Sequence, residues 1–185
     1  MAGKTTATKS KSAKAKRLKS TISEEKPLLF ISHDTRDAEI AKAFGELIHR
    51  SSSGVIQTFR SSDTEGVSGI PYGDEWYRHI TQRLDQASDI VALLTPQSNE
   101  RPWILYECGY GKGRKDITVF GLAFGVSMSK IAGPFKELQN SDDSKTSLVK
   151  LVKELLKRNT DLEAIDDLIQ QHVDEFKEKI DRLVP

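Results

Sequence analysis

The chain has 185 residues, of which 37% are hydrophobic and 30% are charged, and it carries a formal net charge of +1. This length and composition predict one globular domain with short appendages rather than two domains. The longest apolar stretch, residues 119–126, contains two glycines and is too short to cross a bilayer, which takes about 20 apolar residues. No apolar segment follows the basic residues at the N-terminus, so we expect no secretory signal peptide and a cytoplasmic location.

Positive charge is concentrated at the N-terminus. Residues 1–20 contain six lysines and Arg17 but no acidic residue, which leaves 21 basic and 27 acidic residues in the rest of the chain. A Lys/Ser/Thr/Ala segment with little apolar surface cannot offset the entropy lost on ordering, so residues 1–24 are expected to form a disordered basic tail. We expect at most weak attraction to nucleic acid or anionic lipid, because the segment has no aromatic residues on which bases could stack.

The pattern of cysteine and histidine residues argues against disulfides and metal sites. Cys108 is the single cysteine, so it cannot form an internal disulfide. It is expected to be a buried small hydrophobic residue and not a nucleophile. The four histidines show no metal-ligand spacing. We therefore expect no structural metal and no bound cofactor.

Four short runs rich in apolar and β-branched residues predict the strands of a parallel sheet. These runs are residues 28–32, 55–59, 90–94 and 117–120. Helical periodicity predicts one helix in each interval between them and two more near the C-terminus. Residues 122–144 leave open a fifth short strand or irregular connections. The alternation predicts an α/β fold, a flavodoxin-like doubly wound parallel sheet of about five strands with a C-terminal helical extension.

Capping residues predict where the helices begin. The candidates are Asp34 or Thr35, Asp74, Ser98 or Asn99 with Pro102 in the first turn, and a capping box from Thr160 to Glu163. The last helix repeats apolar residues at alternating spacings of three and four, so it could pack on its own domain or on a second copy.

A long loop and three strand ends predict where a ligand would bind. Residues 60–73 (RSSDTEGVSGIPYG) are rich in Ser, Asp and Gly, which is typical of a loop, and loops of this length are often functional. In open parallel sheets, ligands bind outside the carboxyl ends of the strands. The relevant ends are Ser32 and His33, Phe59 and Arg60, and Thr95 and Pro96.

Three segments together resemble the Toll/interleukin-1 receptor (TIR) domain family. LLFISHDTRD at residues 28–37 is similar to the opening strand of the family and its Phe-Ile-Ser signature. The loop at residues 60–73 leads into Trp76, where the family has its BB loop and an aromatic residue. TPQSNERPWILYE contains Trp103-x-x-x-Glu107, which resembles the Trp-x-x-x-Glu pattern of TIR domains that cleave NAD.

The resemblance covers roughly residues 26–158 and is closer to bacterial members than to animal receptor tails. It implies a TIR domain over residues 25–158, followed by a C-terminal amphipathic helix over residues 159–185. The segment from Gly109 to Arg114 matches no nucleotide-binding glycine pattern and follows a helix, so we interpret it as a helix C-terminus.

The proposed chemistry can be checked on the residues themselves. Residues four apart on a helix share a face, so Trp103 and Glu107 would present an indole and a carboxylate together. Nicotinamide carries positive charge before it leaves NAD, so its departure needs no proton. One carboxylate that stabilises an oxocarbenium-like ribose can then suffice, where ordinary glycosidases need two. We expect Glu107 to be an exposed carboxylate in a cleft; the alternative is a surface ion pair.

The remaining candidates for substrate binding follow from the resemblance. It places NAD contacts at the end of the first strand, a closing loop after the second, and a stacking aromatic beyond it. The residues are Ser32, His33, Arg60, Asp63, Glu65, Trp76 and Trp103. His33 departs from the basic residue that some members carry at its position. Core packing is an equal alternative for Trp76.

The resemblance implies an NAD⁺ glycohydrolase that releases nicotinamide and a linear or cyclic ADP-ribose species. Its expected partners are NAD⁺ as substrate, other TIR protomers in a homo-oligomer or filament, and an effector or sensor protein, in signalling or antiphage defence. One alternative is a non-catalytic TIR adaptor that acts through TIR–TIR contacts. Another is an enzyme like the nucleoside deoxyribosyltransferases, in which a Glu attacks a ribosyl carbon.

Overall fold

The computed structural model describes residues 26–64, 74–131 and 133–183. Five parallel strands form one sheet in the order β2-β1-β3-β4-β5. The strands are β1 (Leu28–Ser32), β2 (Gln57–Arg60), β3 (Ala87–Leu94), β4 (Thr118–Ala123) and β5 (Gln139–Asp142). This order is that of the flavodoxin-like doubly wound sheet, and it confirms the predicted fold class.

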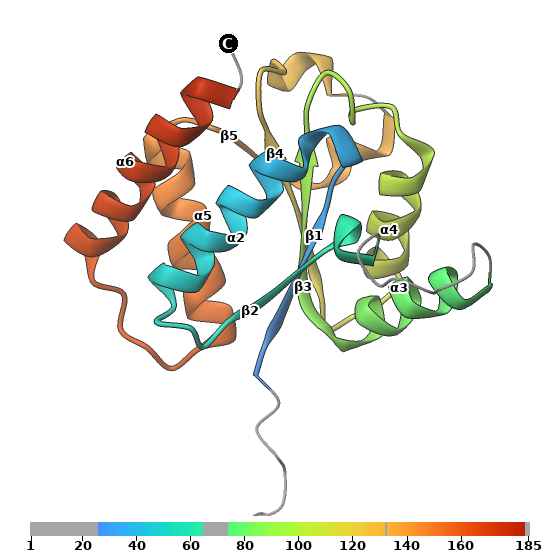
Figure 1. Cartoon of the computed structure of the whole chain (residues 1–185), viewed down its shortest axis with the longest axis horizontal. Helices are drawn as coiled ribbons and strands as arrows, with labels where there is room; N and C mark the ends of the chain where they lie inside the picture. Colours follow the sequence, from blue (N-terminus) through green and yellow to red (C-terminus); the bar gives the residue numbers. More distant parts are fainter. Residues whose placement is uncertain (1–25, 65–73, 132, 184–185) are drawn as a thin grey trace, which may run out of the picture.

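Helices cover both faces of the sheet (Figure 1). One face carries α2 (Ala38–Ser51), α5 (Lys145–Asn159) and α6 (Asp166–Leu183), and the other carries α3 (Asp74–Gln86) and α4 (Pro102–Lys112). Short 3-10 turns follow β1 and β2 as η1 (Thr35–Asp37) and η2 (Ser61–Thr64), and two more precede β5 as η3 (Met128–Lys130) and η4 (Gly133–Glu137). None of the helices in the described part of the chain is long and apolar enough to cross a membrane.

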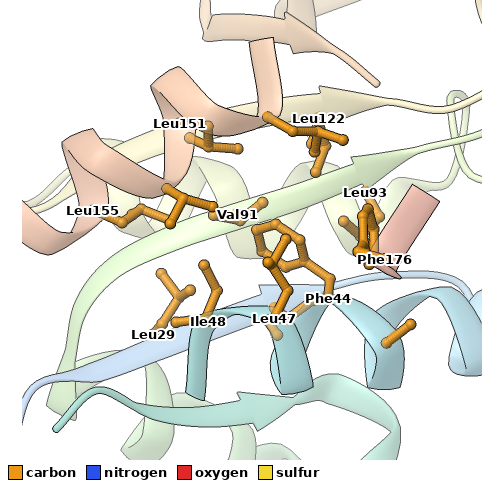
Figure 2. Close-up of a cluster of buried hydrophobic side chains, with 14 of the residues drawn as sticks. Leu29, Phe44, Leu47, Ile48, Val91, Leu93, Leu122, Leu151, Leu155 and Phe176 are labelled. Carbon is orange, nitrogen blue, oxygen red and sulfur yellow. The ribbon is translucent and has the colours of Figure 1, made fainter. Parts of the chain in front are cut away.

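Each face of the sheet has its own hydrophobic core, because side chains alternate along a strand. Leu29 and Ile31 of β1 point into the core beneath α2, α5 and α6, which Figure 2 shows around Phe44 and Phe176. Phe30 points the other way, into the core beneath α3 and α4. The same alternation directs Ser32, at the end of β1, toward the α4 side.

Strand β3 is longer than the sequence predicted. It begins at Ala87, whereas the apolar run predicted a start at residue 90. Asp89 lies within the strand, and its buried carboxylate accepts hydrogen bonds from the Thr118 main-chain N–H, Arg158 and Asn159. A carboxylate with that many donors can be buried, so the polar residue did not mark a boundary. Residues 122–144, for which the sequence left two possibilities open, contain a fifth short strand, β5.

Two of the predicted helix starts are wrong. Arg101, and neither Ser98 nor Asn99, precedes the first turn of α4, although Pro102 lies in that turn as predicted. The Ser98 hydroxyl instead accepts from the Thr95 main-chain N–H at 2.7 Å and holds the turn after β3.

The capping box from Thr160 to Glu163 is also wrong, because α6 begins at Asp166. The Thr160 hydroxyl donates to the carbonyl of Leu156 at 2.9 Å. This hydroxyl therefore closes the end of α5 and does not begin α6. The other two predicted caps behave differently: Asp34 accepts from the Arg36 main-chain N–H and caps η1, and α3 begins at Asp74.

The C-terminal helix packs on its own domain. The Phe176 ring lies 6.2 Å from the ring of Phe44 on α2 and 6.2 Å from that of Phe124, which follows β4. The Nδ1 atom of His172 lies 3.2 Å from the Ser51 hydroxyl. This packing decides between the two placements that the apolar repeat left open.

Candidate active site

The candidate site lies at the carboxyl end of β1, where α4 crosses beside the sheet. Glu107 comes from the middle of α4 and Ser32 from the last position of β1, 75 residues away. The Ser32 hydroxyl donates a hydrogen bond to Oε2 of Glu107. Because side chains alternate along β1, the Ser32 hydroxyl points to the face of the sheet on which α4 lies, and there it meets Glu107.

The Glu107 side chain is fully buried, with 0% of its surface exposed. Its second oxygen, Oε1, has no hydrogen-bond partner among the described residues. The expectation of an exposed carboxylate in a cleft is therefore wrong, and so is the alternative of a surface ion pair. Helical periodicity fixes that Glu107 shares a face with Trp103, but it does not determine how deeply that face is buried.

Burial changes the acidity of this carboxyl group. Removal from water raises the pKa of Glu107 to about 7, because the charged form loses its hydration. The Ser32 hydroxyl and the Trp103 indole partly oppose this rise. The Trp103 N–H acts by proximity, since it forms no hydrogen bond of normal geometry with the described residues. Near neutral pH, Glu107 is poised between its acid and its carboxylate.

An aromatic cluster adjoins Glu107 on α3 and α4. The Trp103 ring lies 4.6 Å from that of Trp76 and is stacked 5.1 Å from that of Tyr106. Tyr77 joins them through a 2.7 Å contact between its hydroxyl and that of Tyr106. Trp76 and Trp103 are half-buried. Trp76 therefore packs against other side chains, in agreement with the core-packing alternative, and part of its surface remains exposed to solvent.

His33 lies beside Ser32 and is almost fully buried, with 5% exposed. Its Nδ1 lies 3.1 Å from the carbonyl oxygen of Ile31 and 3.2 Å from the Ser61 hydroxyl, and its Nε2 lies 3.0 Å from the Ser62 hydroxyl. His33 thus joins the end of β1 to η2. In this arrangement both ring nitrogens are engaged within the protein.

The structure does not bring Arg60 to Glu107. Arg60 ends β2 and lines a hollow against α2 together with Lys42 and Thr58, whereas Glu107 lies on the α4 side. Phe59 takes the α3 side, so strand alternation turns Arg60 away. Asp63 lies in η2, and Glu65 lies outside the described residues.

A second polar cluster, formed by Asp34, Arg36 and Arg101, lies near the carboxyl end of β1 and was not predicted from the sequence. Asp34 is buried and accepts from Arg36 Nε at 2.7 Å and from Arg101. The Arg36 hydrogen bond, followed by those from its main-chain N–H and from Arg101, holds the pKa of Asp34 well below its usual range despite burial. Asp34 was recognised as a cap, but no local signal pairs it with a residue 67 positions later.

Two other interpretations of α4 are confirmed. Cys108 is buried, and burial raises the pKa of its thiol to about 12, so the thiol stays protonated. Gly111 lies in the last turn of α4, where an added Cβ would come within 2.4 Å of Ile90. The glycine permits close helix–sheet packing and belongs to no phosphate loop.

Comparisons with known proteins identify no family. No protein-family model matches the chain, and no curated protein matches it. A solved structure that resembles it is an NAD(P)H:quinone oxidoreductase from Methanothermobacter marburgensis, 12% identical, with 82% of this chain and 96% of that chain covered at a TM-score of 0.35. A likeness of this degree carries no argument about chemistry.

Proposed function

We propose that the protein is a TIR-type NAD⁺ glycohydrolase in which Glu107 acts on the ribose of the substrate. The observation that carries the proposal is the fully buried carboxylate of Glu107 at the carboxyl ends of the strands, with one oxygen bound by Ser32 and the other without a hydrogen-bond partner among the described residues. A buried polar atom left unpaired costs free energy, so it calls for an explanation beyond stability. A substrate hydroxyl or a cationic sugar would satisfy it.

The reaction balances with the residues present. The bond between the ribose C1′ and the nicotinamide nitrogen breaks, and its electron pair neutralises the positive ring. A water oxygen then bonds to C1′ and releases one proton. Glu107, as a carboxylate, would stabilise the positive charge that develops on the ribose, and its low-polarity surroundings would strengthen that attraction.

The aromatic cluster supports a substrate with flat rings. Trp76 and Trp103 lie next to Glu107 and are half-buried, so their remaining surface can stack on a base or on nicotinamide. A ligand at this place would lie outside the carboxyl ends of the strands, where doubly wound sheets bind dinucleotides.

In this structure the surrounding side chains shut Glu107 off from solvent. Because the carboxylate has no exposed surface, the side chains that cover it must move before a substrate can reach it. Self-association of TIR protomers, which the resemblance implies, is one way to supply the free energy for this opening. We therefore propose an enzyme that is inactive as an isolated protomer.

The experiment that tests the function is chromatography of NAD⁺ after incubation with the purified protein at several protein concentrations. We expect nicotinamide and an ADP-ribose species in equal amounts. The Glu107→Gln variant is the matched control, because it keeps the size of the side chain and removes its charge. No loss of NAD⁺ at any concentration would favour the non-catalytic adaptor, and cleavage of free nucleosides would favour a deoxyribosyltransferase-like enzyme.

A further inference from the structure

A polar hollow lies at the amino ends of the strands, opposite the end of the sheet that carries Glu107, where β1 begins at the bottom of Figure 1. Its volume is about 680 Å³, which falls within the range typical of small-molecule sites. Side chains from both faces of the sheet meet there. Those that matter are Lys26, Gln57, Arg83, Ser88, Arg158 and Asn159, and we call this hollow the amino-edge pocket.

The amino-edge pocket is positively charged. Lys26, Arg83 and Arg158 are among its lining residues, and no lining residue is acidic. Arg158 is neutralised by the buried carboxylate of Asp89, which it contacts at 3.0 Å. The other two cations have no carboxylate partner in the described part of the chain, so the pocket keeps a net charge of about +2.

The two unneutralised cations are held by neutral groups. Arg83 donates to the Gln86 side-chain oxygen at 3.1 Å and lies over the Phe59 ring, 5.4 Å from its centroid. The Lys26 amine has a long 3.4 Å contact with the carbonyl of Gly54. Both can therefore turn toward an anion without breaking an ion pair.

Arg158 is held in place and still has donors to offer. Its Nε and Nη2 both bind Asp89, which is fixed in turn by Asn159. The Nη1 group has no hydrogen-bond partner among the described residues. A guanidinium fixed in this way loses little entropy when it binds a phosphate oxygen.

We propose that the amino-edge pocket binds a phosphorylated small molecule of nucleotide size. Lys26, Arg83 and Arg158 would hold the phosphate oxygens, and Gln57 would offer its side-chain amide to a sugar or base. The pocket lies at the edge of the sheet remote from Glu107, so its ligand is distinct from a substrate at the candidate active site and this inference does not depend on the proposed chemistry.

The test is calorimetric titration of the full chain with ADP, ribose 5-phosphate and adenosine at fixed ionic strength. We expect at least one of the two phosphorylated probes to bind, adenosine not to bind, and the affinity to fall as salt is added. Binding of ribose 5-phosphate alongside ADP would identify a phosphosugar site, and binding of ADP alone a nucleotide site. Absence of binding by both phosphorylated probes at millimolar concentration overturns the proposal.

Variants locate the binding in this pocket. Lys26→Gln with Arg83→Gln should weaken binding at least about tenfold, because each removes a charge-assisted hydrogen bond. Lys157→Gln, one residue from Arg158 on the exposed side of α5, should leave binding unchanged. Lys26→Gln alone alters an exposed side chain and tests the pocket even if the double variant unfolds. Unchanged affinity in Lys26→Gln, or in a double variant that folds, would place the ligand elsewhere.

Discussion

Ser32 holds the carboxylate of Glu107 by a hydrogen bond from the end of β1 to the middle of α4, and both side chains are fully buried. Burial raises the pKa of Glu107 to about 7 even though this hydrogen bond opposes the rise. Without the Ser32 hydroxyl, the pKa of Glu107 would rise further above the neutral range.

Removal of the Ser32 hydroxyl should shift the pH dependence of NAD⁺ cleavage. Ser32→Ala removes a hydrogen bond that lowers the pKa of Glu107, so this pKa should rise above its value of about 7. Activity at neutral pH should fall, and it should recover as the pH is raised through the new pKa. Initial rates from pH 6 to pH 9.5 measure the shift.

Ser98→Ala is the matched control for Ser32→Ala. Ser98 is also fully buried at the carboxyl edge, but its hydroxyl donates to the carbonyl of Leu93. Its loss should lower stability by about 1 kcal/mol without moving the pH profile. Equal profiles for wild type and Ser32→Ala would show that the hydrogen bond does not set the acidity of Glu107.

The wild-type protein should itself show a pH-dependent rate set by Glu107. Only the carboxylate can stabilise a positive ribose, so kcat/KM should fall about tenfold for each pH unit well below a pKa of about 7. The measurement is kcat/KM for NAD⁺ between pH 5 and pH 9. A flat profile between pH 5.5 and pH 8 would remove an ionised Glu107 from the mechanism.

Neutralising Glu107 should abolish cleavage and stabilise the protein at high pH. Because the pKa is raised on folding from 4.5 to about 7, the native state binds more protons than the unfolded state between these values. The free energy of unfolding of the wild type therefore decreases as pH rises through this window, by up to about 3 kcal/mol above pH 7.

Glu107→Gln lacks this titration, so its advantage in melting temperature over the wild type should be small near pH 5 and largest above pH 7. Thermal unfolding of both proteins at several pH values checks it. Glu107→Ala is a poorer probe, because removal of a buried side chain leaves a cavity that is itself destabilising. A constant difference across pH would show that the carboxyl group titrates normally.

Deletion of residues 1–20 should change neither the melting temperature nor the turnover number. This segment carries seven cations and little apolar surface, so it has little with which to join the core. Residues 1–25 lie outside those that the structure describes. Comparison of the shortened and full chains by thermal unfolding and NAD⁺ assay tests the prediction, and a fall of several degrees would show that the tail is part of the fold.

Specific activity should increase with protein concentration. The loop at residues 60–73 carries three glycines, so ordering it costs conformational entropy that contacts with a neighbouring protomer could offset. Its residues 65–73 lie outside the described part. The buried state of Glu107 adds a second reason, since the isolated protomer is closed over its carboxylate.

Initial rates over a hundred-fold dilution series, with light scattering in parallel, distinguish assembly from closure of the loop within one chain. The second mechanism predicts a constant specific activity. Activity that stays flat while the protein remains monomeric would contradict activation by assembly and leave the role of Glu107 intact.

The amino-acid sequence by itself determined the fold class and the placement of Trp103 and Glu107 on one face of a helix. Buried strands are recognised as continuous apolar runs, and two residues four positions apart share a face of a helix. Both features depend on residues close together in the sequence. Polar Asp89 hid the first residues of β3, because its partners Arg158 and Asn159 lie about 70 residues away, beyond the reach of any local pattern.

Only the tertiary structure decided the environment of the candidate site. The burial of Glu107 and its hydrogen bond to Ser32 depend on which strands become neighbours and on how α4 lies on the sheet. The direction of the Arg60 side chain, toward α2, depends on the same arrangement. The same holds for Arg101 on Asp34 and for the cations of the amino-edge pocket. Desolvation and charge pairing are set by distances in space between residues remote in the chain, and spacing along the sequence does not encode those distances.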